Sequence, residues 1–307
     1  MRQQNVLPKT SCIYVLLHNC AREQAGLLKR ISPLPHGRSW GKQPSPRLMQ
    51  EVSRRITTLL TLILTVLTMR QGTAHGAETI LVSAAASLRE SLTEIGSSYI
   101  KSRPDQRVRF NFASSGTLQQ QIERGAPVDV FISAADKQMN ALGAKNLVIH
   151  ATRRVLAHNE LVLIVPRTSR IPIESFSDLS SPAVRRIAIG APASVPAGEY
   201  AEQMLRKLGL WNRVRLKAVQ GKDVREVLTQ VALGNVDAGL VYRTDAATTP
   251  QVRVVKAAPK GSHQPINYSM AVVTSTRHSA AARAFLNYLQ SPSARAVLRR
   301  RGFIVPR

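Results

Sequence analysis

Short apolar runs alternate along the chain with stretches in which apolar residues recur every three or four positions. Such runs are typical of buried strands, and the longer period is typical of helices that pack one face against a sheet. The runs predict strands at 79–83, 108–112, 129–133, 161–165, 186–190, 238–242 and 270–274. This alternation predicts an α/β fold built from βα units around a parallel sheet.

Helical faces follow most of the predicted strands. Four of them carry Leu88, Leu92, Ile95 and Tyr99; Tyr200, Met204, Leu205 and Leu208; Val224, Val227, Leu228 and Val231; and Ala284, Phe285, Tyr288 and Leu289. Gly125, Gly209 and Gly234 come just after helical stretches, where a left-handed residue is favoured. The runs at 160–165 and 268–274 are candidates for paired crossovers between two lobes, although periodicity alone leaves this open.

Residues 56–68 form an apolar stretch of a different kind. Its thirteen residues would rise about 20 Å as a helix, too short for a ~30 Å hydrocarbon core. Arg54 and Arg55 precede it, and the small-x-small sequence at 74–76 follows it, as in a secretory signal. We therefore expect a signal peptide at 49–76, cut after Gly76, rather than a buried helix. Residues 1–48, which lack sustained periodicity, are expected to be a disordered leader or an over-called start ahead of Met49.

Composition and charge narrow the possible partners. Of 307 residues, 44% are hydrophobic and 20% charged, which is ordinary for a globular protein. Lys and Arg number 43 against 18 acidic residues, and the part after residue 76 carries a formal charge of +16. This charge suits an anionic partner or a merely solvated surface. Aromatic residues are only 5%, too few for a nucleic-acid stacking platform, and with export they argue against a nucleic-acid partner.

The cysteines exclude one class of site. The two in the chain, Cys12 and Cys20, both precede residue 77. The exported part therefore has neither a cysteine-framed metal site nor a disulfide scaffold.

Candidate chemistry gathers at four predicted helix starts. Ser87 and Glu90 have the S-x-x-E spacing of a capping box. The sequence ASSGTL at 113–118 leads into a second helix, Pro196 suits the first turn of a third, and Asp223 can cap a fourth. Each start exposes backbone N–H groups, which together with the helix dipole attract an anion.

Converging helix starts could hold a dianion with neutral dipoles alone, helped by two serine hydroxyls and a tyrosine hydroxyl. A fully deprotonated oxyanion only accepts hydrogen bonds, so a site made of donors admits it and rejects a protonated anion. Taken singly, each feature has a common structural explanation: a serine that heads a helix is usually a cap, and Tyr242 at a strand end is usually packing. Spacing alone does not show that the four starts meet.

At these residues the chain resembles the periplasmic molybdate-binding proteins (ModA), which are the substrate-binding components of molybdate ABC importers. The resemblance covers 77–307 and keeps the family's order of motifs. These are AAASL at 84–88, FASSGTL at 112–118, GAPVDVFISA at 125–134, VPAGEYA at 195–201, DVREVL at 223–228 and GLVYRTDA at 239–246. Gly116 stands where some members have a further serine, and we take Ser115 rather than Ser114 as the contact.

The resemblance implies a type II periplasmic-binding-protein fold, with two α/β lobes and a ligand cleft between them. Lobe I would comprise 77–160 plus 268–307, and lobe II 161–267. The implied ligand-binding residues supply hydroxyl or backbone donors from both lobes: Ser87, Ser115, Ala197, Val224 and Tyr242. Molybdenum would be bound only as the oxyanion through these residues, with no cofactor.

The implied function is high-affinity binding of molybdate, and of tungstate, in the periplasm. A monomer would deliver the ion to a membrane permease with its ATPase, without catalysing a reaction. One alternative is a binding protein for another tetrahedral oxyanion such as sulfate.

The sequence argues against two further functional classes. A serine-dependent periplasmic hydrolase would use Ser87 or Ser115 as its nucleophile. The chain has no G-x-S-x-G elbow, however, and its histidines after residue 76 form no motif with either serine. A transcription regulator would need a helix-turn-helix, and residues 1–76 contain no such pair of amphipathic helices.

Overall fold

The structure, a computed structural model, describes residues 47, 50 and 77–306. The predicted leader at 1–48 and signal peptide at 49–76 lie outside the described residues, apart from those two positions. Residues 77–306 belong to one compact unit. Within the described ranges, no helix has the length and apolar character needed to cross a membrane.

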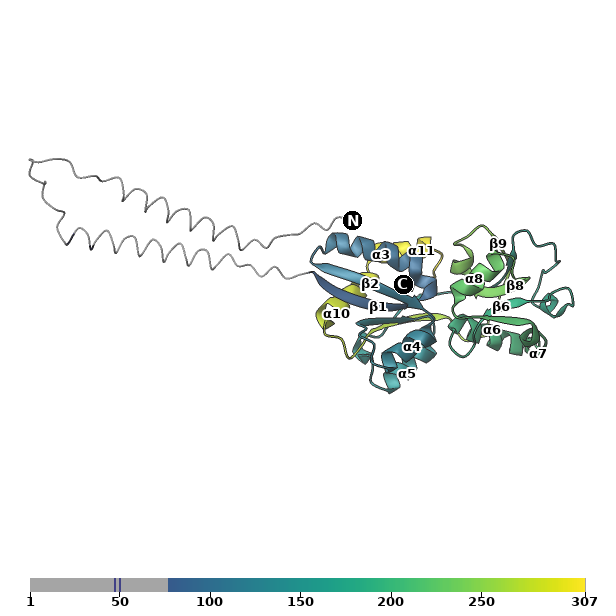
Figure 1. Cartoon of the computed structure of the whole chain (residues 1–307), viewed down its shortest axis with the longest axis horizontal. Helices are drawn as coiled ribbons and strands as arrows, with labels where there is room; N and C mark the ends of the chain where they lie inside the picture. Colours follow the sequence, from purple (N-terminus) through teal and green to yellow (C-terminus); the bar gives the residue numbers. More distant parts are fainter. Residues whose placement is uncertain (1–46, 48–49, 51–76, 307) are drawn as a thin grey trace, which may run out of the picture. The chain divides into compact units, whose positions relative to one another are not determined.

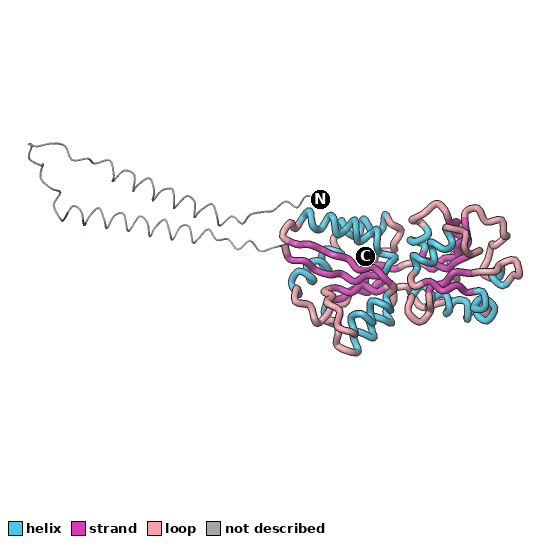
Figure 2. The backbone as a smooth tube through the Cα atoms, in the orientation of Figure 1, coloured by secondary structure: helices cyan, strands magenta, loops and turns pink. Residues whose placement is uncertain are grey.

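Two five-stranded sheets form the framework, with helices around each (Figures 1 and 2). The first has the order β2 (Gln106–Ala113), β1 (Glu78–Ala85), β3 (Val130–Ser133), β10 (Asn267–Val272), β4 (Arg154–His158). The second has the order β7 (Ala218–Gly221), β6 (Ile187–Gly190), β8 (Ala238–Tyr242), β5 (Leu161–Pro166), β9 (Val252–Ala257). We call the first sheet with its helices lobe I and the second sheet with its helices lobe II.

Both sheets are mixed, so the predicted parallel sheet is wrong in part. In lobe I, β1 pairs in parallel with β2 and β3, but β10 is antiparallel to β3 and β4. In lobe II, β6 pairs in parallel with β7 and β8, but β5 is antiparallel to β8 and β9. The two reversed strands are those that the chain reaches from the other sheet. They lack the helical crossover that produces parallel neighbours.

The runs at 160–165 and 268–274 do mark the two crossings between the lobes, as predicted, but they do not pair with each other. These runs correspond to β5 and β10, which lie in different sheets and already have a partner on each side. The chain passes between the sheets through 159–160 and 258–266.

Helices lie on both faces of each sheet. In Figure 1, α3 and α11 lie on one face of the first sheet and α4 and α5 on the other, while α8 and α6 lie on opposite faces of the second. Their bounds are α3 Arg89–Ser102, α4 Ser115–Glu123, α5 Asp136–Ala144, α6 Pro196–Lys207, α7 Trp211–Val214, α8 Val224–Ala232, α9 Arg243–Ala246, α10 Ser279–Leu289 and α11 Pro292–Arg300. Short 3-10 turns are η1 (Ala86–Leu88), η2 (His150–Thr152), η3 (Ser177–Ser180) and η4 (Arg215–Lys217).

The predicted apolar faces are largely confirmed. The four residues expected on the first face, from Leu88 to Tyr99, are buried, as are all four on α8. Leu208 is an exception because it lies at the end of α6 and is 38% exposed. Gly125, Gly209 and Gly234 have φ of +84°, +72° and +71°, as predicted for helix ends.

The topology determines where a site can form. The loops after β1 and β2 in lobe I lead into η1 and α4, and those after β6 and β7 in lobe II lead into α6 and α8. In sheets of this kind the carboxyl ends of parallel strands and the amino ends of the following helices lie on the same edge. Residues from these edges of both lobes line one pocket.

Candidate functional site

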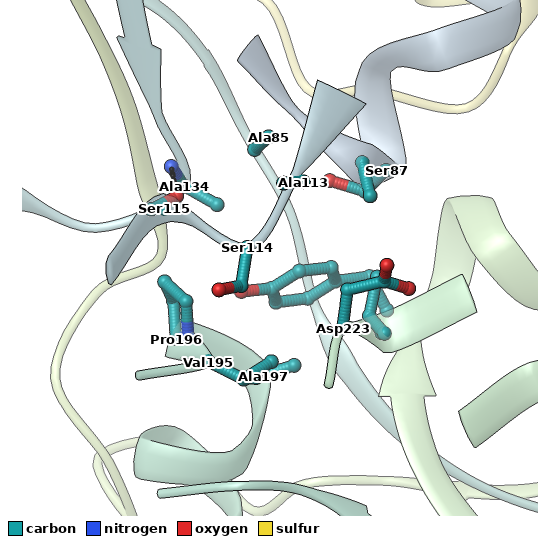
Figure 3. Close-up of a pocket in the computed structure, with 13 residues that line it drawn as sticks. Ala85, Ser87, Ala113, Ser114, Ser115, Ala134, Val195, Pro196, Ala197 and Asp223 are labelled. Atoms are coloured by element: carbon teal, nitrogen blue, oxygen red, sulfur yellow. Dashed lines mark hydrogen bonds between the residues drawn. The ribbon is translucent and has the colours of Figure 1, made fainter. Parts of the chain in front are cut away.

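One pocket brings together all five residues that the sequence analysis singled out (Figure 3). Its thirteen lining residues are Ala85, Ala86, Ser87, Ala113, Ser114, Ser115, Ala134, Val195, Pro196, Ala197, Asp223, Val224 and Tyr242. The cavity volume is about 10 Å³, far below that of pockets for drug-sized ligands. The pocket is therefore too small for a drug-sized ligand.

Ser87 does not form the predicted capping box. Its hydroxyl shares a hydrogen bond of 2.8 Å with the hydroxyl of Tyr268, and Glu90 contacts Arg225 instead of the helix start. The reason is the 3-10 turn η1, which places Ser87 inside the turn rather than ahead of it, so no side chain caps η1 or α3.

Ser114 and Ser115 both line the pocket but have different partners. Ser114 is the cap of α4, and its hydroxyl accepts a hydrogen bond from Thr117 N. The fully buried Ser115 Oγ accepts from Ala134 N at 3.0 Å, so its own proton stays available for donation. Ser115 is also the first residue of α4, where a backbone N–H has no partner within the helix.

Ala197 and Val224 contribute backbone groups from the first turns of α6 and α8. The prediction of Pro196 in the first turn of α6 is confirmed, and no side chain caps that helix. Asp223 caps α8 as predicted, since its Oδ1 accepts from the amides of Arg225 and Glu226. This cap uses the second and third amides of the helix and leaves that of Val224 without a helical partner.

Tyr242 ends β8 with its hydroxyl inside the protein. The residue is 1% exposed, and its Oη has no hydrogen-bond partner among the described residues. Burial raises the pKa of Tyr242 well above its ordinary value. The side chain is therefore a neutral O–H donor at any physiological pH.

The pocket lining contains neutral donors rather than cations. None of its thirteen residues is Lys, Arg or His, and Asp223 is the charged residue among them. In the part of the chain that the structure describes, no three His, Cys, Asp or Glu residues come together as a possible metal site. Such a lining matches an ion that only accepts hydrogen bonds.

A buried ion pair next to the pocket was missed by the sequence analysis. Arg225 directly follows Val224, and its Nε lies 2.9 Å from Oδ1 of Asp245, which is fully buried. Burial raises the pKa of Asp245 to about 7, although Arg225 opposes this shift. No local pattern could have revealed the second contact of Arg225, because Glu90 lies 135 positions away.

Similarity to known proteins agrees with this geometry. Residues 80–304 match the family described as "Bacterial extracellular solute-binding protein". The Bacillus subtilis protein named "Putative ABC transporter substrate-binding lipoprotein YvgL" is 43% identical over 225 residues, which is 73% of this chain and 86% of that protein. The molybdate-binding protein ModA of Haemophilus influenzae is 40% identical over 227 residues, which is 73% of this chain and 89% of that protein.

A solved structure extends the similarity to the fold. The periplasmic molybdate-binding protein of Azotobacter vinelandii matches with a TM-score of 0.67 and 25% identity, over 74% of this chain and 100% of that chain. Together with the two sheets described above, this match confirms the predicted two-lobe, type II fold.

Proposed function

This chain belongs to the family of bacterial extracellular solute-binding proteins, and we propose that it binds molybdate and delivers it to an ABC importer. The observation that carries the proposal is the pocket in which neutral donors from four helix starts and one strand end meet. The molybdate-binding relatives, at 40% and 38% identity, support molybdate as the ligand.

We assign hydrogen-bond donors to each of the five predicted ligand-binding residues. Ser87 and Ser115 offer hydroxyl and backbone donors, Ala197 and Val224 offer backbone N–H groups, and Tyr242 offers its phenolic O–H. Burying a dianion is tolerable only if nearly every oxygen accepts hydrogen bonds. Molybdenum is then held only as its oxyanion, and no cofactor is needed.

The same donors account for selectivity in this proposal. Tungstate has nearly the size and charge of molybdate and binds alike. Sulfate is smaller, so donors fixed on two lobes leave it with longer, weaker hydrogen bonds. Because the ion is bound and released unchanged, the protein acts without turnover.

The cellular setting completes the proposal. Residues 49–76 act as a signal peptide, and the rest of the chain works as a monomer in the periplasm. It hands the ion to a membrane permease with its ATPase. The lobes divide into 77–160 plus 268–307 and 161–267, and the membership of the strands in the two sheets supports this division.

Thermal unfolding of the purified protein with a panel of anions tests the function. A ligand of the folded state at a hundred times its Kd adds about 2.7 kcal/mol to the free energy of unfolding. Molybdate and tungstate should therefore raise the melting temperature by several degrees, while sulfate and phosphate at equal concentration should raise it much less. Indifference to molybdate and tungstate would refute the proposal, and hydrolysis of generic ester or phosphate substrates would point to an enzyme.

A further inference from the structure

Among the described residues, two ion pairs join a helix of lobe I to a helix of lobe II. Glu90 on α3 contacts Arg225 on α8, and Lys137 on α5 lies 3.2 Å from Glu199 on α6. In each pair one residue belongs to a helix of the first sheet and the other to a helix of the second.

Both pairs lie next to the pocket. Arg225 directly follows Val224, and Glu199 comes two residues after Ala197. On the lobe I side, Glu90 and Lys137 each come three residues after a pocket-lining residue, Ser87 and Ala134. In Figure 3, Ser87 and Asp223 lie toward the right of the view, and Ala134 and Pro196 toward the left. The two pairs thus adjoin different parts of the pocket lining.

The Arg225 side chain is fixed on lobe II before it meets lobe I. It is 19% exposed, its Nε lies beside Asp245, and its Nη1 donates to Thr248 Oγ1 at 3.0 Å. A guanidinium held in this way loses little freedom when it contacts Glu90, and partial burial reduces screening by salt. Lys137 is more exposed, at 61%, so its pair contributes less.

We propose that Glu90–Arg225 and Lys137–Glu199 form an interlobe clamp that sets how long the bound ion is retained. The proposal rests on the proposed function, because it needs an ion held between the lobes. Both pairs form only when the lobes are together, so they stabilise the closed arrangement selectively. Release of the ion requires the lobes to separate, whereas capture starts from separated lobes. The clamp residues are therefore positioning residues that act on dissociation and not on association.

The chain offers a matched control for each pair. Glu94 lies one turn after Glu90 on α3 and also contacts arginines, Arg300 and Arg301, but these belong to lobe I. Lys145, at the end of α5, pairs with Glu123 of α4 at 3.0 Å, again within lobe I. Its exposure of 57% is close to that of Lys137.

The test measures the dissociation rate of radiolabelled molybdate from the purified protein during a chase with unlabelled molybdate. We expect Glu90→Gln to raise this rate about fivefold and Lys137→Gln about twofold, with about tenfold for both together. Lys137→Arg, which keeps the positive charge, should dissociate at the rate of the unmodified protein. Association rates and the melting temperature without molybdate should stay near those of the unmodified protein, because the clamp acts only on how readily the closed lobes separate.

The controls separate this proposal from the proposed function. Glu94→Gln and Lys145→Gln should leave the dissociation rate unchanged. If the unmodified protein retains molybdate but Glu90→Gln and Lys137→Gln release it no faster than the controls, the clamp is refuted and molybdate binding stands. If the unmodified protein retains no labelled molybdate, the proposed function itself fails.

Discussion

The hydroxyl of Tyr242 is a buried donor for which the described part of the chain provides no acceptor. A buried polar group without a partner destabilises a protein by about 1–3 kcal/mol, and the same group gains a strong bond when it meets a charged acceptor. One side chain can therefore lower the stability of the free protein and raise its affinity for an anion.

Tyr242→Phe should thus change stability and binding in opposite directions. We expect the free energy of unfolding without an anion to rise by about 1 kcal/mol, because the unsatisfied hydroxyl is gone. Molybdate affinity should fall by about tenfold to a hundredfold, because a donor to the ion is lost. Calorimetric unfolding and titration with molybdate measure the two effects. Unchanged affinity would exclude Tyr242 from the ion's contacts.

Asp245 predicts a pH dependence of stability. Burial raises its pKa to about 7 in the folded protein, against 3.8 for an unperturbed carboxyl. Between these two values the folded state keeps a proton that the unfolded state has lost. The free energy of unfolding therefore falls as pH rises, by up to about 1.4 kcal/mol per pH unit, and the fall ends near pH 7.

The comparison with Asp245→Asn isolates this contribution. The variant should lack it, so the stability of the unmodified protein relative to the variant should decline from about pH 4 to pH 7 and then level off. Chemical denaturation at a series of pH values measures the difference. A constant difference across this range would show that Asp245 is ionised throughout.

The residues of the site show what a sequence can and cannot reveal. The helix starts at Ser115 and Val224 were predictable from a local pattern of small or capping neighbours, whereas the choice of these two residues as contacts came from the family resemblance. The bond between Ser87 and Tyr268 and the contact between Glu90 and Arg225 join residues 181 and 135 positions apart. Such partners depend on how distant segments of the chain fold together, so the capping box inferred from local spacing was wrong.

At the scale of elements, the start of helix α8 both lines the pocket and carries a cap that stabilises lobe II. Asp223 accepts hydrogen bonds from two amides at its start, and loss of such a cap costs about 0.5–2 kcal/mol. The same cap aligns the first turn, from which Val224 faces the pocket.

Asp223→Ala should therefore lower the free energy of unfolding by about 1 kcal/mol, as measured by denaturant titration. Asp223→Asn keeps a capping oxygen and should stay within a few tenths of a kcal/mol of the unmodified protein. Equal stability of the alanine and asparagine variants would mean that the cap contributes nothing. Ser291→Ala, which removes the cap of α11 in lobe I, is a control for cap loss away from the pocket.

The elements themselves were largely predictable. All seven predicted strands exist within a few residues of their expected bounds; six are interior strands with buried apolar runs, and the seventh, β2, is a half-buried edge strand that keeps an alternating apolar pattern. The missed strands β4, β7 and β9 are all at sheet edges and are half exposed, so they lack a continuous apolar run. Strand direction was less predictable, since it depends on which sheet the chain has just left.

For the molecule as a whole, the positive net charge is not matched by positive charge in the pocket lining. The part after residue 76 carries +16, but no basic residue lines the pocket. The surplus charge acts on an approaching anion from a distance, and salt screens such fields within about 10 Å at 0.1 M.

Raising the salt concentration should therefore slow the association of molybdate several-fold. In the Glu90→Gln, Lys137→Gln double variant, which lacks the interlobe ion pairs that salt would also weaken, the dissociation rate should change by no more than about twofold, because the contacts that hold the ion are short and buried. Stopped-flow measurement at several concentrations of sodium chloride tests this. A steep rise of the dissociation rate with salt in this double variant would indicate a direct contact between the ion and a basic side chain.

The position of β10 between β3 and β4 also dictates an order of assembly. Every strand of the second sheet lies within 161–257, so that sheet can be complete while residues 258–307 are still unsynthesised or not yet translocated. The first sheet contains the earliest strands, yet it stays interrupted until residues 267–272 are available. The lobe that the chain begins first is thus the one that it finishes last.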